Sequence, residues 1–318
     1  MPLRIVLMGT GEFAVPPFRA MLDSEHQVVG TLTQPDKTGR GHHQHVNVVK
    51  ELATIRGVPV FQPERVNRPD MLDILRSLHA DVFIVAAYGQ ILKPELLAIP
   101  RLGAFNLHGS LLPRHRGAAP VQYSIWKGDT VTGVTIFQIE PALDSGPMVG
   151  KVETPIGETE TSGELMLRLA ELSVPLTLLV VRQLADGTAT FELQDSSHVT
   201  FAPRILREAG SIDWSKTRRE IDCHVRAMQP WPKASSALLR NGHPPLRCLV
   251  QQVVPRPDIV PLAPGPEVGS VTELAGRLFV ATGDGWLEIL RLQPEGRKST
   301  DGRSFVNGYP LQSGDRFE

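Results

Sequence analysis

Apolar segments that alternate with helical ones dominate the first 110 residues and constrain the fold most strongly. Residues 81–89, DVFIVAAYG, are apolar at every position from Val82 to Ala87, which is typical of a strand buried on both faces of a sheet. Residues 3–11, LRIVLMGTG, form another apolar run, which ends in glycines and precedes a helical pattern. Strands that alternate with helices at this spacing form parallel sheets covered by helices. The sequence therefore predicts a doubly wound, Rossmann-like α/β domain.

The same spacing continues beyond these two strands. Further strands are expected at residues 26–34, 58–62, 103–108 and 132–140, and helices at 48–57, 71–79, 121–128 and 163–184. In sheets of this kind ligands bind beyond the carboxyl ends of the strands. A turn-rich stretch without a long period follows the last helix and favours a linker. We expect the first domain to span residues 1–190 and the linker to span residues 191–205.

The rest of the chain, residues 206–318, shows a different pattern. A helix is expected at residues 219–229, and after it come short apolar runs such as CLVQQVV, RLFVATG and WLEILRLQ, separated by Gly, Pro and Asp. Short strands with such turns are typical of a small antiparallel barrel. A chain of 318 residues also exceeds the size of most single cores. We therefore predict a second, C-terminal β-barrel domain of OB-like type.

Composition limits the classes of protein and of partner. The net charge is −1, but residues 201–318 carry 16 Lys and Arg against 13 Asp and Glu. This mild basic excess is compatible with nucleic acid and also with an ordinary surface. Cys223 and Cys248 lack metal-ligand spacing and are too few for a disulfide framework, so reduced thiols are expected. No run approaches the roughly 20 apolar residues of a membrane span, and we expect a cytoplasmic monomer.

The glycine-rich turn at residues 9–13, GTGEF, allows a dinucleotide-binding interpretation. Gly9 and Gly11 are followed by Val15 and Pro16, so the third glycine of the G-x-G-x-x-G pattern is missing. No matching acidic residue is apparent at the end of a second strand. The turn is better explained as a sharp passage from a strand into a helix.

Residues 106–113, NLHGSLLP, contain the strongest candidates for chemistry. Asn106 and His108 are two positions apart at the end of a strand, so their side chains face the same side of the sheet. An amide can stabilise an oxyanion, and an imidazole can carry a proton near neutral pH. Asp144 follows the strand expected at 132–140, and in a parallel sheet it would reach the same edge and favour protonated His108. Hydrogen-bonded structural polarity and an Asx turn are the alternatives for these residues.

The segments NLHGSLLPRHRGAAP, AYGQIL and ALDSGPM resemble those of formyltransferases that use 10-formyltetrahydrofolate. In that family the residues matching Asn106, His108 and Asp144 are the catalytic set. The resemblance narrows to the methionyl-tRNA formyltransferases through MGTGEFAVP, TQPDKTGRG, IDWS, RAMQPWPKA and ATGDGWLEI, and it covers nearly the whole chain. It implies no metal and a folate donor bound by Ser110, Leu111, Leu112, Pro113, Tyr88, Gly89, Ile91 and Leu92.

The chain departs from this family in a loop that enters the tRNA acceptor stem. The family has lysines there, whereas this chain has His42, His43 and His45, which are mostly neutral at pH 7 and attract phosphate less. A solvated loop explains these histidines better than a metal site, because no carboxylate or Cys lies nearby. Basic residues expected to contact tRNA are Arg40, Lys50, Arg204, Arg207, Lys216, Arg218, Arg219, Lys233, Arg297 and Lys298.

Together these features predict transfer of a formyl group from 10-formyltetrahydrofolate to the α-amine of methionyl initiator tRNA. Two alternatives remain open at this point. The acceptor could be a small amine such as an amino sugar, although a second domain is then unexplained. The chain could also be a nucleotide-binding or RNA-binding protein without catalysis, which leaves Asn106, His108 and Asp144 without a role.

Overall fold

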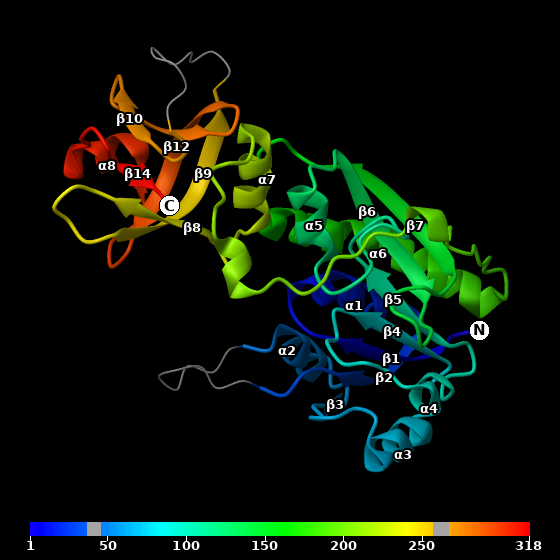
Figure 1. Ribbon diagram of the computed structural model, residues 1–318. Helices are drawn as coiled ribbons and strands as arrows, with labels where there is room; N and C mark the ends of the chain where they lie inside the picture. The colour runs from blue at the N-terminus through cyan, green and yellow to red at the C-terminus, as the bar shows by residue number, and fades with distance from the viewer. Residues whose placement is uncertain (37–45, 257–266) are drawn as a thin grey trace. The chain divides into compact units, whose positions relative to one another are not determined.

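The computed structural model describes residues 1–36, 46–256 and 267–318, and the chain forms two compact units (Figure 1). The first unit consists of residues 1–120, 131–155 and 165–203. The second unit consists of residues 121–130, 156–164 and 204–318. Two short segments of the second unit are therefore inserted in the sequence of the first.

A seven-stranded sheet with the order β3-β2-β1-β4-β5-β6-β7 forms the centre of the first unit. Its strands are β1 (Arg4–Gly9), β2 (Gln27–Leu32), β3 (Val60–Phe61), β4 (Val82–Ala86), β5 (Ala104–His108), β6 (Val131–Gln138) and β7 (Met148–Pro155). The five strands β1 to β5 pair in parallel. Because chain order reverses where β1 meets β4, this is a doubly wound sheet, as the sequence predicts.

Strand β6 runs antiparallel to β5, so the expectation of a parallel strand there is wrong. The connection from β5 to β6 starts with residues 109–120 of the first unit, where Arg116 pairs with Phe201. Its helix α5 (Pro120–Trp126) packs within the second unit, where the rings of Trp126 and His224 are 5.6 Å apart. No crossover helix returns the chain to the other end of the sheet, and β6 therefore runs back along β5. Strand β7 was not predicted from the sequence.

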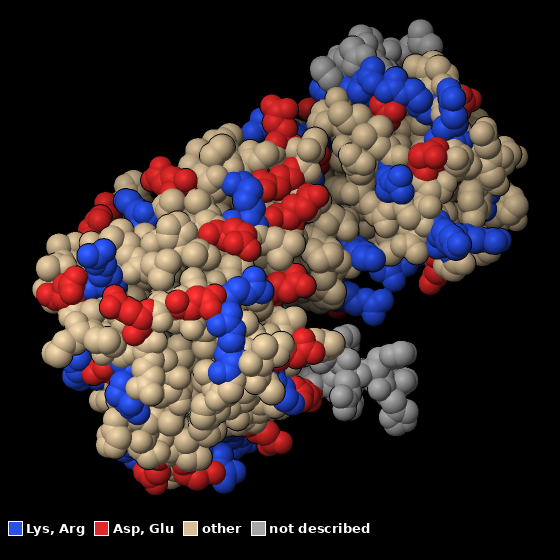
Figure 2. Space-filling model, turned by 180° about the vertical axis from the view of Figure 1, so that it is seen from behind, with Lys and Arg blue, Asp and Glu red and all other residues tan. Residues whose placement is uncertain are grey.

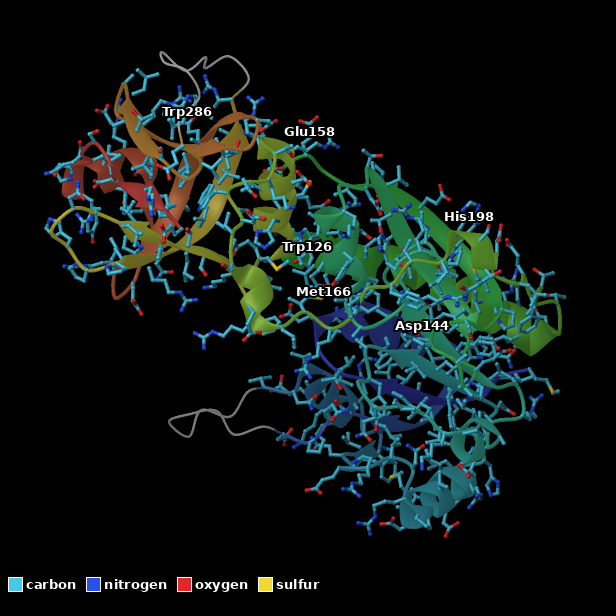
Figure 3. The ribbon with its side chains drawn as sticks, in the orientation of Figure 1. Trp126, Asp144, Glu158, Met166, His198 and Trp286 are labelled. Carbon is cyan, nitrogen blue, oxygen red and sulfur yellow. The ribbon has the colours of Figure 1, made fainter. Side chains whose placement is uncertain are left out.

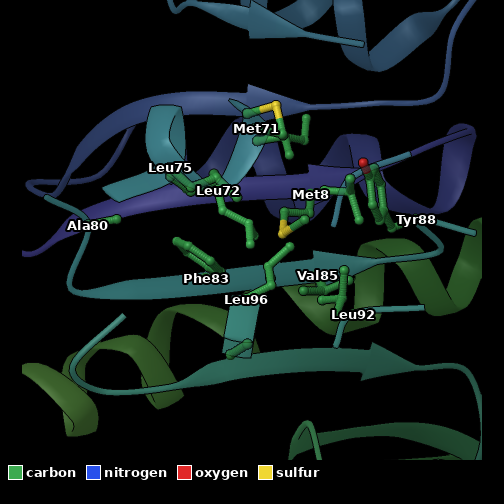
Figure 4. Packing of buried hydrophobic residues seen from close by; sticks show 14 of the residues in the cluster. Met8, Met71, Leu72, Leu75, Ala80, Phe83, Val85, Tyr88, Leu92 and Leu96 are labelled. Carbon is green, nitrogen blue, oxygen red and sulfur yellow. The ribbon is translucent and has the colours of Figure 1, made fainter. Parts of the chain in front are cut away.

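Helices surround this sheet (Figure 1). They are η1 (Glu12–Ala14), α1 (Val15–Leu22), α2 (Val48–Ile55), α3 (Pro69–Ser77), α4 (Pro94–Leu97), α6 (Ser162–Asp186) and η2 (Ser196–His198). On one face, Met8 of β1 and the alternate β4 residues Phe83 and Val85 share a core cluster with Leu72 and Leu75 of α3 (Figure 4). The period of two along each strand places these residues on one face.

Gly9 shows why the turn after β1 contains glycine. A Cβ at Gly9 would lie 2.6 Å from Cε2 of Phe18 and 2.8 Å from the carbonyl oxygen of Ala86. The residue is therefore required for close packing of α1 against the sheet, which supports the structural interpretation of the GTGEF segment.

A second sheet of seven strands forms the C-terminal barrel, as predicted, with the order β10-β11-β12-β9-β8-β14 and β13 paired to β12. The strands are β8 (Ala234–Leu239), β9 (Leu246–Pro255), β10 (Val271–Leu274), β11 (Arg277–Thr282), β12 (Gly285–Pro294), β13 (Thr300–Asp301) and β14 (Arg316–Phe317), and the helices are η3 (Arg207–Gly210), α7 (Arg218–Ala227) and α8 (Gly302–Gly308). The amide of Phe317 donates to the carbonyl oxygen of Gly269 at 2.9 Å, which brings the two edges of the sheet together. The OB-like architecture follows.

The IDWS segment contributes to this barrel. The Trp214 ring is buried 5.6 Å from the ring of Phe317, and its Nε1 donates to the Ser236 hydroxyl at 2.9 Å. Buried Trp requires such a partner for its N–H group. Thr217 and Glu220 then form a capping box that starts α7. Across the described ranges, none of the helices combines the length and apolar character that a membrane span requires.

Candidate active site

Two polar residues lie at the carboxyl end of β5 on one face of the sheet. Asn106 pairs with Val85 of β4 and Phe137 of β6, and His108 pairs with Thr135 of β6. The Asn106 side chain is partly exposed and forms no hydrogen bond with any residue the structure describes. Because the amide is held by a central strand and its polar atoms have no partner among the described residues, it is available to bind a substrate group.

His108 is almost fully buried, with 5% of its side chain exposed. Its Nε2 lies 2.9 Å from the backbone carbonyl oxygen of His115, and the ring meets Phe137 edge-on at 6.2 Å between centroids. A carbonyl oxygen can only accept, so Nε2 carries the hydrogen and Nδ1 is the basic atom of the neutral ring. The tautomer that the carbonyl selects therefore has its basic nitrogen on the side of Asp144.

Asp144 lies in the loop between β6 and β7 (Figure 3). Its carboxylate approaches the basic nitrogen of His108. Its Oδ2 lies 3.8 Å from Nδ1 of His108 and accepts a hydrogen bond from the amide of Gly117 at 2.7 Å. Asp144 has a φ of 45°, in the left-handed region that few residues other than Gly adopt. Asp144 lies beside His108, as expected from the sequence. However, it reaches His108 from the turn between the antiparallel strands β6 and β7.

The Asp144 carboxylate favours the protonated ring of His108, as the sequence predicts, but burial acts in the opposite direction. Burial disfavours the charged ring and lowers the pKa of His108, and this effect outweighs the opposing attraction of Asp144 and the hydrogen bond to His115. His108 is therefore neutral near pH 7 and can accept a proton at Nδ1. The carboxylate then stabilises the imidazolium that forms.

The loop after His108 is held by its own polar groups. The Thr135 hydroxyl donates to the carbonyl oxygen of Ser110 at 2.8 Å and accepts from the amide of Leu112 at 3.1 Å. The Ser110 hydroxyl donates to the carbonyl oxygen of Arg114 at 2.7 Å, and Leu112 packs with Phe137. Ser110 and Leu112 thus shape the loop, whereas Leu111 and Pro113 are partly exposed beside it.

The second segment that the resemblance assigns to a folate donor follows β4, next to β5. The Tyr88 side chain is buried in the core cluster, which raises the pKa of its hydroxyl, and within the described chain this hydroxyl has no hydrogen-bond partner. Leu92 is also buried, whereas Gly89 is exposed and Ile91 is 84% exposed. Gly89 and Ile91 are therefore the members of this set that a ligand can reach.

The basic residues expected to bind tRNA are placed in different surroundings. Arg40 lies outside the described residues, as do His42, His43 and His45. Lys50 forms an ion pair with Asp36, and Arg218 forms one with Asp284 at 3.2 Å. Lys216 is exposed, 4.0 Å from Asp213, and Lys233 is partly exposed. The remaining candidates are exposed residues of the second unit, namely Arg204, Arg207, Arg219, Arg297 and Lys298. The face of the second unit seen in Figure 2 carries several basic side chains.

Several residues around the site were missed by sequence reasoning. Gln194 donates to the carbonyl oxygen of Asp144 at 2.8 Å and accepts from Arg116 at 2.8 Å. Thr135 holds the loop after His108, as described above. A lone Gln or Thr in a turn-rich stretch carries no distinguishing pattern, so no local signal was available. In the described ranges, no group of three or more His, Cys, Asp and Glu side chains is arranged to hold a metal ion.

Comparison with known proteins assigns the family. Residues 3–181 match the family described as Formyl transferase, and residues 204–310 match the family described as Formyl transferase, C-terminal domain. The chain belongs to the formyl transferase family. The first match includes the β5 pair Asn106 and His108 together with Asp144.

Solved structures share the fold of this formyltransferase at low sequence identity. The sugar 3N-formyl transferase WlaRD, studied with dTDP and 5-N-formyl-THF, is 16% identical, with a TM-score of 0.67 over 94% of this chain and 100% of that chain. An N-formyltransferase from Helicobacter canadensis, in complex with folinic acid and dTDP-3-aminofucose, is 16% identical, with a TM-score of 0.65 over 91% and 99%. HypX from Aquifex aeolicus, in complex with tetrahydrofolic acid, is 15% identical, with a TM-score of 0.59 over 100% and 51%. This chain therefore spans about half the length of HypX.

Proposed function

We propose that this formyltransferase moves the formyl group of 10-formyltetrahydrofolate to the α-amine of methionyl initiator tRNA. The donor supplies an activated formyl carbon bonded to a nitrogen leaving group. The single observation that carries the proposal is the Asn106 amide, which has no hydrogen-bond partner among the described residues and lies on the same strand face as His108. A polar pair of this kind suits a reaction in which an oxyanion forms and a proton moves.

The roles follow from the geometry of the three side chains. The acceptor amine attacks the formyl carbon, a carbon–nitrogen bond forms, and Asn106 donates a hydrogen bond to the carbonyl oxygen as it becomes negative. The amine proton passes to Nδ1 of His108, because Nε2 is committed to the His115 carbonyl. Asp144, 3.8 Å from Nδ1, stabilises the imidazolium. The proton then moves to the donor nitrogen as its bond to the formyl carbon breaks.

The second domain does not by itself identify the acceptor. WlaRD, described as a sugar 3N-formyl transferase, aligns with 94% of this chain, so its match extends into both domains. The presence of a second domain therefore does not exclude a small acceptor. The choice of tRNA depends on the IDWS and RAMQPWPKA segments, on the basic side chains of the second unit and on the surface around Trp231.

Trp231 offers an exposed aromatic surface two positions before a basic residue in the sequence. The side chain is 53% exposed and is flanked by Pro230 and Pro232, with Lys233 two positions further on. A backbone hydrogen bond holds the two ends of this segment together, because the Lys233 amide donates to the Met228 carbonyl oxygen at 2.8 Å. Exposed aromatic rings next to positive charge are typical of surfaces on which unpaired bases stack. An amino-sugar acceptor gives this ring no role.

A formylation assay tests the proposal. The purified protein is incubated with 10-formyltetrahydrofolate and either methionyl initiator tRNA or an amino sugar nucleotide, and we expect the tRNA to be formylated. If only the amino sugar were formylated, the proposal of tRNA as the acceptor would be wrong, whereas the proposal of formyl transfer would stand.

The Asn106→Ala variant tests the catalytic assignment separately. Loss of one oxyanion donor reduces turnover by about 100- to 1000-fold. An exposed residue with the same side chain, Asn307, provides the control substitution Asn307→Ala. Near-normal turnover of Asn106→Ala would contradict the role of Asn106.

A further inference from the structure

Gln194 lies in the segment expected to be a linker and contacts the loop of Asp144. Its Oε1 accepts from Nε and Nη2 of Arg116 at 3.1 Å and 2.8 Å. Its Nε2 donates to the carbonyl oxygens of Asp144 and Gly146 at 2.8 Å and 2.9 Å. A glutamine amide has two N–H groups to donate and two lone pairs to accept with, so every polar position of this side chain is used.

The backbone on both sides of Gln194 is paired to the same region. Met148 and Glu192 exchange two backbone hydrogen bonds of 2.8 Å, immediately beyond the Asp144 loop. Arg116 donates to the carbonyl oxygen of Thr200 at 2.9 Å and accepts from the amide of Ala202 at 2.7 Å. Residues 192–202 are therefore attached at one end to β7 and at the other to the loop that follows His108.

These contacts hold both parts of Asp144. Gln194 binds its backbone carbonyl, and Gly117, the residue after Arg116, binds its carboxylate at 2.7 Å. Asp144 needs such support because its backbone is in the left-handed region, with a φ of 45°. Conformations of this kind persist when the surrounding structure fixes them.

We propose that Gln194 is a positioning residue that sets the distance between the Asp144 carboxylate and His108. The inference rests on the catalytic role proposed for Asp144. Residues 192–202 are then a structural part of the active site. Glutamine suits this position because it accepts from Arg116 and donates to two carbonyl oxygens at once. Glutamate would accept from Arg116, but it would place a negative charge against the Asp144 and Gly146 carbonyl oxygens.

Two variants separate these contributions. Gln194→Met keeps the approximate volume and removes all four hydrogen bonds, whereas Gln194→Glu keeps the Arg116 contact and removes the donors. A displacement of about 1 Å of a catalytic group costs on the order of 100-fold in rate. We expect kcat to fall about 10- to 100-fold in both variants, with KM for the acceptor unchanged. Gln27→Met is the matched control, because Gln27 also accepts from an arginine, Arg4, at 2.9 Å, but at an exposed site.

The decisive measurement is a double-mutant cycle with Asp144→Asn. If Gln194 acts through Asp144, then Gln194→Met causes little further loss of kcat once Asp144 has been replaced. An equal loss in both backgrounds, or normal kcat of folded Gln194→Met and Gln194→Glu, would overturn the proposal. Thermal melts establish that each variant is folded. If Asp144→Asn itself turned over normally, the failure would lie in the proposed role of Asp144, and the positioning role would fall with it.

Discussion

Replacement of Asp144 by Asn changes one charge next to a buried imidazole, and its effect on the pKa of His108 can be worked out. Nδ1 of His108 and Oδ2 of Asp144 are 3.8 Å apart. Two unit charges at about this distance attract by roughly 4 kcal/mol at an effective dielectric constant of about 20. This attraction favours the charged ring and opposes the cost of burying it. Because 18% of the Asp144 side chain is exposed, water screens part of it.

The sign follows from the charges. The carboxylate favours the imidazolium, so its removal lowers the pKa of His108 further below the usual value of 6.5. We therefore expect Asp144→Asn to lower the pKa of His108, because the attraction between the carboxylate and the imidazolium is lost. Asn retains an oxygen that can accept from Gly117, so the loop should keep its position. The pKa is measured by NMR titration of ring carbons in histidine-labelled protein, with the His108 signal assigned through His108→Gln.

A second Asp–His pair provides the control. Oδ2 of Asp195 lies 3.7 Å from Nε2 of His198, almost the same separation, but both side chains are more than half exposed. Asp195→Asn should therefore leave the pKa of His108 unchanged, because it removes the same charge from an exposed pair that does not include His108. An unchanged or raised pKa of His108 in Asp144→Asn would refute the proposed electrostatic coupling. An equal fall of the His108 pKa in Asp195→Asn would show that the effect does not come from Asp144.

Three further predictions concern stability and substrate binding. Gly117 has a φ of 125°, and a Cβ there would lie 2.6 Å from the Ala202 carbonyl oxygen. Gly117→Ala should therefore lower the free energy of unfolding by about 1–3 kcal/mol in urea denaturation and also reduce turnover. Wild-type stability of this variant would contradict the prediction. Burial lowers the pKa of His224 below 6.5, so the unfolded state binds more protons and the stability of the protein falls as pH drops below about 6.5. The His224→Gln variant should lose less stability over that pH range. An equal loss in the variant and the wild type would contradict the effect of burial. Trp231→Ala should weaken tRNA binding by about 1–3 kcal/mol, measured by filter binding at fixed salt concentration. The KM for the folate donor should stay constant. Unchanged affinity for tRNA would exclude stacking on Trp231.

The sequence by itself predicted the doubly wound sheet and the C-terminal barrel, and it singled out Asn106, His108 and Asp144 as candidate catalytic residues. Strand β4 could be recognised because burial on both faces requires an unbroken apolar run, as in residues 82–86, whereas β7, which is partly buried at alternate positions over most of its length, was missed. The period of two in a strand was enough to place Asn106 and His108 on one face. These properties depend on residues close together in the chain, so a local pattern is sufficient to predict them.

Tertiary structure alone decided how the site is completed. The direction of β6 depends on where the connecting segment packs, and the protonation of His108 depends on burial that its neighbours in sequence do not reveal. Gln194 reaches Asp144 across 50 positions of the chain, and no periodicity links the two. Contacts of this kind arise when separate loops meet at the edge of a sheet, so the residues that position Asp144 could be found only in the folded protein.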